Sequence, residues 1–162
     1  MLGYPWDGYV VAANDIGIHA PVLHHWCTLH PEKMAGWERE RRQAGRPAGY
    51  TRWGRRIHQS VDRQVTAWGG GSSGLLGVTV ARDALGCERI VLCGVPMTRS
   101  PHFAESTVHP RGKPWPSAHS HWKVWVKDTN VARMKGRVRS MSGRTKDLLG
   151  APTREWLEEG DE

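Results

Sequence analysis

The chain contains, at residues 68–74, the stretch Trp68-Gly69-Gly70-Gly71-Ser72-Ser73-Gly74, and an apolar run follows from Leu75 to Leu85. A glycine-rich turn that opens onto a helix leaves several backbone N–H groups unpaired and pointing the same way, and the helix dipole adds partial positive charge there. Such a turn is typical of an anion site, most often one for phosphate. The competing interpretation is that the glycines only allow close packing of helix and strand.

The elements that flank this turn predict an α/β fold. Residues 60–68 are expected to form a short strand before the turn, and Ser72 or Ser73 is suited to cap the helix after it. The run from Arg89 to Val95 is nearly all apolar, as in a strand that is covered on both faces. The order strand, glycine turn, helix, strand predicts a right-handed crossover between two strands of one parallel sheet.

The remaining segments extend the same pattern. Residues 9–13, 22–29 and 136–143 are predicted strands, and helices are expected within residues 117–134, at 145–149 and from Pro152 onward. We therefore predict a single compact domain over residues 1–162 with a Rossmann-like, mostly parallel sheet and helices on both faces. A basic excursion at about 32–59 and a long loop at about 96–117 are expected to interrupt it.

Polar residues follow several of the predicted strands. In open α/β sheets ligands bind at the carboxyl ends of the strands, so these residues are expected to meet at one edge, although position by itself assigns no role. The predicted ligand-binding residues are Asn14, Gly70, Gly71, Ser72, Ser73, Gly74, Pro96, Met97, Ser140 and Ser142.

Asp15, His30 and His121 are the candidate catalytic bases. Asp15 has the alternative of capping a turn, and His30 that of a satisfied histidine at a strand end. His119 and His121 are two residues apart and would face different ways on a helix, so a metal shared between them is not expected. No metal site is predicted.

Composition limits the class of protein. The 162 residues carry a formal net charge of +7, which favours phosphorylated or polyanionic partners. No apolar run approaches the roughly 20 residues that span a bilayer, and the start lacks the pattern of a secretion signal, so we expect a soluble cytoplasmic protein without a membrane partner. The three cysteines include no Cys-x-x-Cys pair and are expected to be buried free thiols.

A nucleic-acid partner is a less favoured alternative. Arg52, Arg55 and Arg56 are interleaved with Tyr50 and Trp53, and aromatic rings between cations can stack on bases. A solvated charged face explains the same residues, and no motif that reads a nucleic-acid groove is present. The basic residues near Ser142, namely Arg139, Arg144 and Lys146, are either solvated or neutralise phosphates.

Two stretches carry a resemblance to known families. Residues 71–76, together with Leu85-Gly86-Cys87 and residues 89–96, resemble the nucleotide-binding core of CMP-sialic-acid-dependent sialyltransferases. They are also similar to 6-hydroxymethylpterin diphosphokinase-like proteins, and Val10 to Asn14 resembles an earlier strand of both families. The resemblance covers roughly residues 9–15 and 69–97. It implies a nucleotide or nucleotide sugar as ligand, and transferase activity of a glycosyltransferase or phosphotransfer kind.

The sequence departs from these families in two places. They begin with an extra strand and a Gly-x-Gly-x-Ser turn, where this chain has only Met1 to Gly8. The kinase-like proteins carry Gly-x-Asp where this chain has Gly94-Val95-Pro96, which argues against an acidic or metal-binding role there. The resemblance implies that His119 or His121 corresponds to the general-base histidine of the bacterial sialyltransferases, and spacing does not decide between them.

Three functions are therefore compared: a transferase that acts on a nucleotide, a non-catalytic protein that sequesters a nucleotide-derived signal, as a compact virus-encoded or phage protein would, and a basic nucleic-acid-binding module. The sequence names neither the ligand nor the acceptor. It also leaves open whether the chain forms a homo-oligomer.

Overall fold

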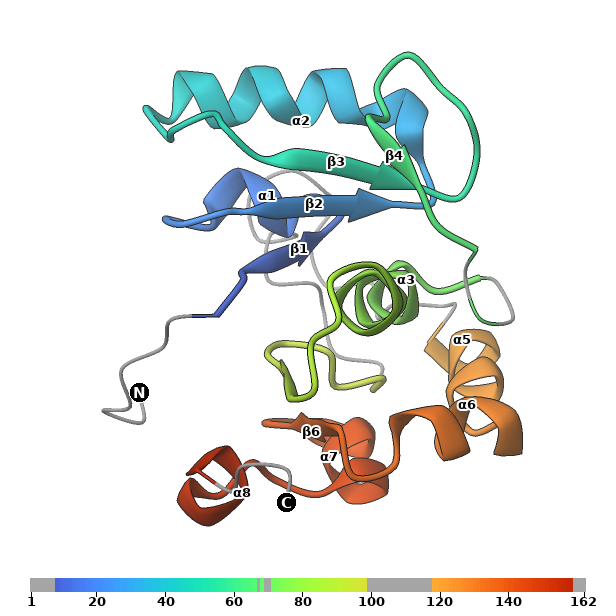
Figure 1. Cartoon of the computed structure of the whole chain (residues 1–162). Helices are drawn as coiled ribbons and strands as arrows, with labels where there is room; N and C mark the ends of the chain where they lie inside the picture. Colours follow the sequence, from blue (N-terminus) through green and yellow to red (C-terminus); the bar gives the residue numbers. More distant parts are fainter. Residues whose placement is uncertain (1–7, 67, 69–70, 99–117, 159–162) are drawn as a thin grey trace.

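The computed structural model describes residues 8–66, 68, 71–98 and 118–158 (Figure 1). It is an α/β structure whose larger sheet has four strands in the order β1-β2-β3-β4, all of them parallel. This confirms the predicted class and the parallel sheet. The strands are β1 (Val11–Ala13), β2 (His25–Thr28), β3 (Thr51–Gly54) and β4 (Arg63–Gln64).

Helices pack on both sides of this sheet, and Figure 1 shows α2 and α3 on opposite sides of it. No helix within the described ranges is both long and apolar enough to cross a bilayer. The helical elements are α1 (Ile16–His19), α2 (Pro31–Gln43), α3 (Ser73–Thr79), the π-helical turn η1 (Val80–Ala84), α5 (Ala118–Trp125), α6 (Asp128–Met134), α7 (Gly143–Leu149) and α8 (Arg154–Glu158).

The prediction that the strands before and after the glycine turn and its helix belong to one sheet is wrong. Strand β4, before the glycine turn, belongs to the larger sheet, whereas β5 (Ile90–Leu92) pairs in parallel with β6 (Val138–Ser140) in a separate two-stranded sheet. The physical reason is the burial of α3 on two sides. Leu75 and Val78 pack with the residues of β5 and β6, and Leu76 packs against the larger sheet.

Within the stretch 32–59, residues 34–42 are suited to a surface helix and lie in α2, but the remainder is not only an excursion, because it supplies all of β3. A buried arginine helps to build this part. Arg41 is 1% exposed, and its guanidinium donates to the carbonyl oxygens of Gly17 at 2.6 Å and Ala20 at 2.8 Å, and to that of Pro47 at 3.0 Å. These bonds satisfy carbonyl groups around the end of α1 and fix the loop before β3.

Strand β2 shows how the larger sheet divides the core. Successive side chains of a strand point to opposite faces. Trp26 packs with Met34 of α2, while Cys27 packs with Leu76 of α3, and both strand residues are fully buried. Burial raises the pKa of the Cys27 thiol to about 12. Cys87 is only half-buried and Cys93 is exposed, however, so the expectation of buried thiols is confirmed for Cys27 alone.

The carboxyl-terminal third differs from the prediction in its boundaries. The helical pattern over residues 117–134 is divided between α5 and α6, and the carboxamide of Asn130 in α6 donates to the carbonyl of Val124 at 2.7 Å. Helix α8 begins at Arg154 and not at Pro152. The hydroxyl of Thr153 accepts a hydrogen bond from the N–H of Trp156 at 3.2 Å, which satisfies a free donor of the first turn.

The indole of Trp26 fits under α1 because Gly17 has no side chain, so adding a methyl group at Gly17 should destabilise the protein. A Cβ atom at Gly17 would overlap the Trp26 indole, which is fully buried and donates to the carbonyl of Asn14 at 2.6 Å. We expect Gly17→Ala to lower the free energy of unfolding by about 1–3 kcal/mol, the usual cost of overpacking, in urea denaturation.

The matched control is Gly36→Ala in α2. The nearest atom to a Cβ there is a guanidinium nitrogen of Arg39 at 4.0 Å. This variant should keep the wild-type stability or gain up to about 1 kcal/mol from helix propensity. Equal stability of the two alanine variants would contradict the assigned packing.

Candidate functional site

Three separate segments meet at the first turn of α3. The hydroxyl of Ser73 accepts a hydrogen bond from the N–H of Leu29, the residue after β2, at 3.4 Å. A Cβ atom at Gly74 would lie 3.2 Å from Cγ1 of Val95 and 3.4 Å from the Trp125 ring, so the chain after β5 and helix α5 both reach this point. Figure 1 shows α5 at the end of the molecule toward which β2 and β3 point.

The two serines of the glycine-rich turn have different environments. Ser72 is 4% exposed, and its hydroxyl accepts from the N–H of Leu75 at 3.4 Å and from the Trp125 indole at 3.1 Å. Ser72 is therefore a helix cap, as predicted, and a structural residue. Ser73 is half-buried, and the proton of its hydroxyl is not used in the bond with Leu29. Of the two hydroxyls, that of Ser73 is the one placed to donate to a ligand.

The structure describes two glycines of this turn, Gly71 and Gly74. Gly71 is exposed and has a φ of +88°, a conformation that favours glycine, with nothing within 4 Å of a Cβ built there. A ligand can therefore approach its backbone closely. Gly70 lies outside the described residues.

Asn14 follows β1 and adopts a left-handed conformation, with a φ of +56°, which is uncommon for a residue other than glycine. Its N–H donates to the carbonyl of Cys27 at 3.0 Å, and its carboxamide oxygen accepts from the hydroxyl of Thr28 at 2.9 Å. Because the side chain uses only its oxygen in these bonds, the carboxamide nitrogen is placed to donate to a ligand. Asp15 is half-buried at the start of α1 and makes no side-chain cap there, so the capping alternative is not what the structure shows.

His30 and His121 lie within electrostatic reach of each other, although they are far apart in the sequence. Burial lowers the pKa of His121, and the charge of His30 lowers it further. His30 is exposed, and its Nδ1 lies 3.4 Å from a carboxylate oxygen of Glu32. The imidazole of His121 is therefore biased toward the neutral form that can accept a proton. The side chain of His119 lies outside the described part of the chain.

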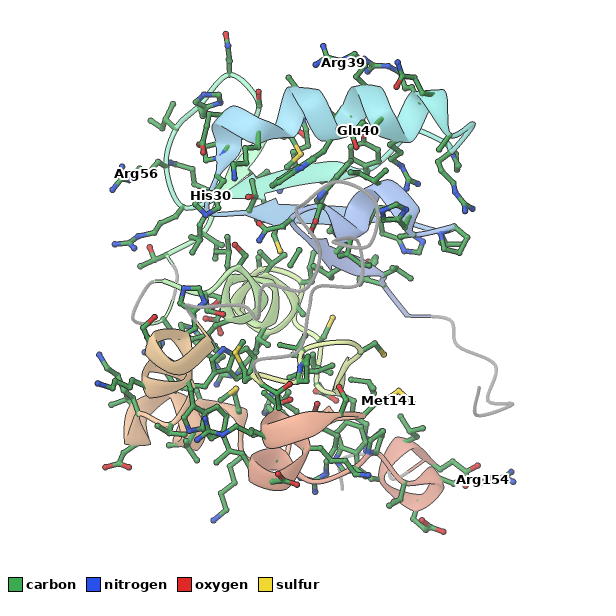
Figure 2. All side chains as sticks on the ribbon, turned by 180° about the vertical axis from the view of Figure 1, so that it is seen from behind. His30, Arg39, Glu40, Arg56, Met141 and Arg154 are labelled. Carbon is green, nitrogen blue, oxygen red and sulfur yellow. The ribbon has the colours of Figure 1, made fainter. Side chains whose placement is uncertain are left out.

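We call the group formed by Asn14, His30, Ser73, Gly74 and His121 the candidate site. The structure does not bring every predicted residue into it. Figure 2 shows Met141, which follows β6, on the opposite side of the molecule from His30. The strand ends of the two sheets therefore do not form the single edge that was expected, because β6 is not hydrogen-bonded to the larger sheet.

The remaining predicted residues are part of the framework around β5 and β6. Ser140 is fully buried, and its hydroxyl lies 2.8 Å from that of Thr145. The side chain of Met97 is in the core, and its φ is +52°. The carbonyl of Pro96 accepts from the N–H of Arg144 at 2.9 Å, which joins the turn after β5 to α7.

One contact in this region was not expected. The guanidinium of Arg144 lies 4.1 Å from the centre of the Trp122 ring. Nearby, the hydroxyl of Ser142 is buried and has no hydrogen-bond partner in the described part of the chain. The sequence named both Ser142 and Arg144, but nothing in it indicated that Trp122 would hold the arginine, because the two lie on different helices.

The predicted stacking surface for nucleic acid is not formed. Trp53 is 5% exposed, and its indole donates to Nδ1 of His25 at 3.1 Å. Tyr50 packs edge-on against Trp26, and Arg52 forms a bidentate pair with Asp62 at 2.6 and 3.0 Å. These rings and this cation therefore stabilise the sheet and do not face a ligand.

Arg56 belongs instead to the surroundings of the candidate site. Thr28 of β2 pairs with Gly54 of β3, so His30 and Arg56 are each two residues beyond a paired position. Figure 2 shows the two side chains at the same end of the sheet, and Arg56 is exposed. It adds positive charge near His30.

Among the described residues, no group of three or more His, Cys, Asp or Glu side chains is placed to hold a metal ion. Comparison of the chain with protein-family models, with curated proteins and with solved structures found no match.

The pairing of the two histidines makes a prediction about the pKa of His121. We expect an NMR titration to place this pKa below the ordinary value of 6.5, because the group is buried and lies near another histidine. His30→Gln should raise the pKa of His121 without restoring 6.5, since burial is the larger cause.

His19→Gln is the matched control, because His19 lies on α1 and is not among the causes of the shift. That change should leave the pKa of His121 where it is in the wild type. An unchanged value in His30→Gln would show that the two side chains are not within electrostatic reach of each other.

Proposed function

We propose that the candidate site binds a nucleotide or another nucleotide-derived, phosphorylated ligand, and that the protein is a transferase with a Rossmann-like nucleotide-binding core. The observation that carries this proposal is the meeting of Ser73 and Gly74, at the first turn of α3, with His30 and His121. It joins groups suited to phosphate with groups suited to proton transfer. The site also lies beyond the ends of parallel strands, where open α/β sheets bind ligands.

The binding half of the proposal rests on the start of α3. This helix continues directly into η1, so helical structure runs from Ser73 to Ala84 behind the first turn. The free N–H groups of that turn, the Ser73 hydroxyl and the carboxamide of Asn14 are all donors, as a phosphate requires. A Cβ atom at Gly74 would crowd Val95 and Trp125, so there is little room for a side chain at this position.

The catalytic half rests on the two histidines. A neutral His121 would accept the proton of an attacking hydroxyl as that oxygen bonds to the transferred group and the bond to the departing phosphate breaks. His30, whose Nδ1 lies 3.4 Å from a carboxylate oxygen of Glu32, would donate a hydrogen bond to the departing phosphate. The carboxylate of Asp15, the residue after Asn14, is the alternative base.

A non-catalytic sequestering protein would use the same binding groups. The exposure of His30 is the observation that favours this alternative, because transfer of a group usually takes place where water is excluded. The two functions differ in the fate of the ligand, and this difference can be measured.

Turnover and retention are separated by incubating the protein with nucleoside mono- and diphosphates and nucleotide sugars, and by identifying the small molecules with mass spectrometry. The proposed transferase converts at least one nucleotide sugar or nucleoside diphosphate to a new product when a hydroxyl acceptor is added. Release of only unchanged ligand on denaturation would favour sequestration. Absence of binding to every member of the panel would contradict both functions.

Ser73 and Ser72 provide a matched pair of substitutions. Ser73→Ala should weaken nucleotide binding by about fivefold, the worth of a hydrogen bond of about 1 kcal/mol, and Ser73→Glu should abolish it by charge repulsion. Isothermal titration calorimetry checks the affinities. Neither change should lower the stability substantially, because Ser73 is half-buried and is not the cap of α3.

Ser72→Ala is expected to behave in the opposite way. It removes the helix cap and the acceptor of the Trp125 indole, so the free energy of unfolding should fall by about 1–2 kcal/mol. Wild-type affinity in Ser73→Glu would place the ligand elsewhere.

A further inference from the structure

The contact between Arg144 and Trp122 holds a cation in a defined orientation. At 4.1 Å from the ring centre, the guanidinium lies against the aromatic face. A guanidinium is planar, and stacking on an aromatic ring fixes its plane while its N–H groups stay free at the edge. This arrangement prepares the group for bidentate recognition of an oxyanion, at a lower entropic cost than a freely moving side chain would have.

The position of the pair connects it to the candidate site. Trp122 follows His121 directly in α5, and Trp125 of the same helix donates to the Ser72 cap at the start of α3. On the other side, the N–H of Arg144 donates to Pro96, which follows Val95, and Val95 contacts the position of Gly74. Two independent connections therefore link Arg144 to the first turn of α3, where Ser73 and Gly74 of the candidate site lie.

Among the described residues, no acidic side chain neutralises the charge of Arg144. Several other arginines are held by protein acceptors: Arg41 by carbonyl groups, Arg52 by Asp62, and Arg139 by the carbonyl of Leu149 at 2.6 Å. Arg144 is exposed, and no ion pair formed among the described residues includes it.

Ser142, two residues earlier, provides a second donor without an acceptor. Its hydroxyl is buried and unpartnered in the described part of the chain, although it occupies the cap position of α7. Buried polar groups normally have a partner, so this hydroxyl is an unmet donor next to an unmet cation. Helix α7 has only seven residues, and the argument rests on these side chains and not on its dipole.

We infer that Arg144, held by Trp122, binds a second oxyanion of the same ligand whose first phosphate binds at Ser73. This inference rests on the proposed function and specifies the ligand class: a nucleotide with at least two separate anionic groups. The second group is a further phosphate or the carboxylate of a nucleotide-linked acidic sugar, and both offer the oxygen pair that a guanidinium fork recognises. Trp122 is a positioning residue, since it acts through Arg144.

The experiment compares ligands that differ by one anionic group. Calorimetric affinities are measured for the 5′-mono- and 5′-diphosphates of uridine, cytidine, adenosine and guanosine, and for UDP-glucose and UDP-glucuronate. Arg144→Gln should lower the affinity for the ligand with the extra oxyanion by about tenfold or more, which is the contribution of a charge-assisted bidentate contact. The affinity for the ligand without that oxyanion should stay within about twofold of the wild-type value.

The source of the second oxyanion follows from which pair of ligands is affected. Selective loss for diphosphates over monophosphates assigns Arg144 to a second phosphate. Selective loss for UDP-glucuronate over UDP-glucose assigns it to a carboxylate. An equal loss for every ligand, or no loss for any of them, would overturn the inference.

Further variants separate charge, orientation and general effects. Arg144→Lys keeps the charge but not the fork, so it should recover only part of the lost affinity. Trp122→Leu should weaken the binding of the same ligand whose binding Arg144→Gln weakens. Trp122→Phe should keep most of the wild-type affinity, because it keeps an aromatic face. Arg39→Gln is the matched charge control, since Figure 2 shows Arg39 on the outer side of α2. It should bind like the wild type.

This design keeps the two proposals distinguishable. If the wild-type protein binds nucleotides and Ser73→Glu does not, but Arg144→Gln binds all of them normally, the proposed function stands and the role of Arg144 is wrong. If the wild-type protein binds none of the ligands, both proposals are wrong.

Discussion

The structure depends on the burial of α3 on two sides. Leu76 and Val80 continue the core of the larger sheet with Cys27 and Trp53, while Leu75 and Val78 pack toward β5 and β6. Burial of each such side chain contributes on the order of 1.5–3 kcal/mol, so the two sheets are held by one shared helix without hydrogen bonds between them. The first turn of this helix is consequently fixed by packing on both sides, which is the requirement for a preorganised binding site.

The polar residues around that turn divide into those that hold the framework and those that remain available. Ser72 and Ser140 use their hydroxyls in hydrogen bonds within the protein, and Arg41 uses Nε and one of its two terminal nitrogens in the same way. The hydroxyl of Ser73 accepts a hydrogen bond and keeps its proton for donation, and the guanidinium of Arg144 forms no ion pair among the described residues. This division is a stronger indication of a binding site than the residue types alone, because buried polar groups are normally satisfied within the fold.

Much of the local structure could be predicted from the sequence. The strands near residues 11–13, 25–28 and 90–92 follow from apolar runs, and a strand near residues 138–140 is also predicted. A serine cap at Ser72 or Ser73 follows from their position before the helix. The sheet membership of β5 could not be predicted, because strand pairing depends on partners far away in the sequence. Likewise, the charge of residues 32–59 masked β3, whose Arg52 pairs with Asp62, the residue before β4.

The candidate site shows the same boundary between local and distant information. The sequence by itself determined that a glycine-rich turn opens α3 and that polar residues follow the strands, because turns, caps and apolar runs are properties of neighbouring residues. Only the tertiary structure decided that His121 approaches His30, that Ser73 and not Ser72 is free to donate, and that Trp122 holds Arg144. These relations join residues on different elements, and the packing of those elements around α3 sets the distances between them.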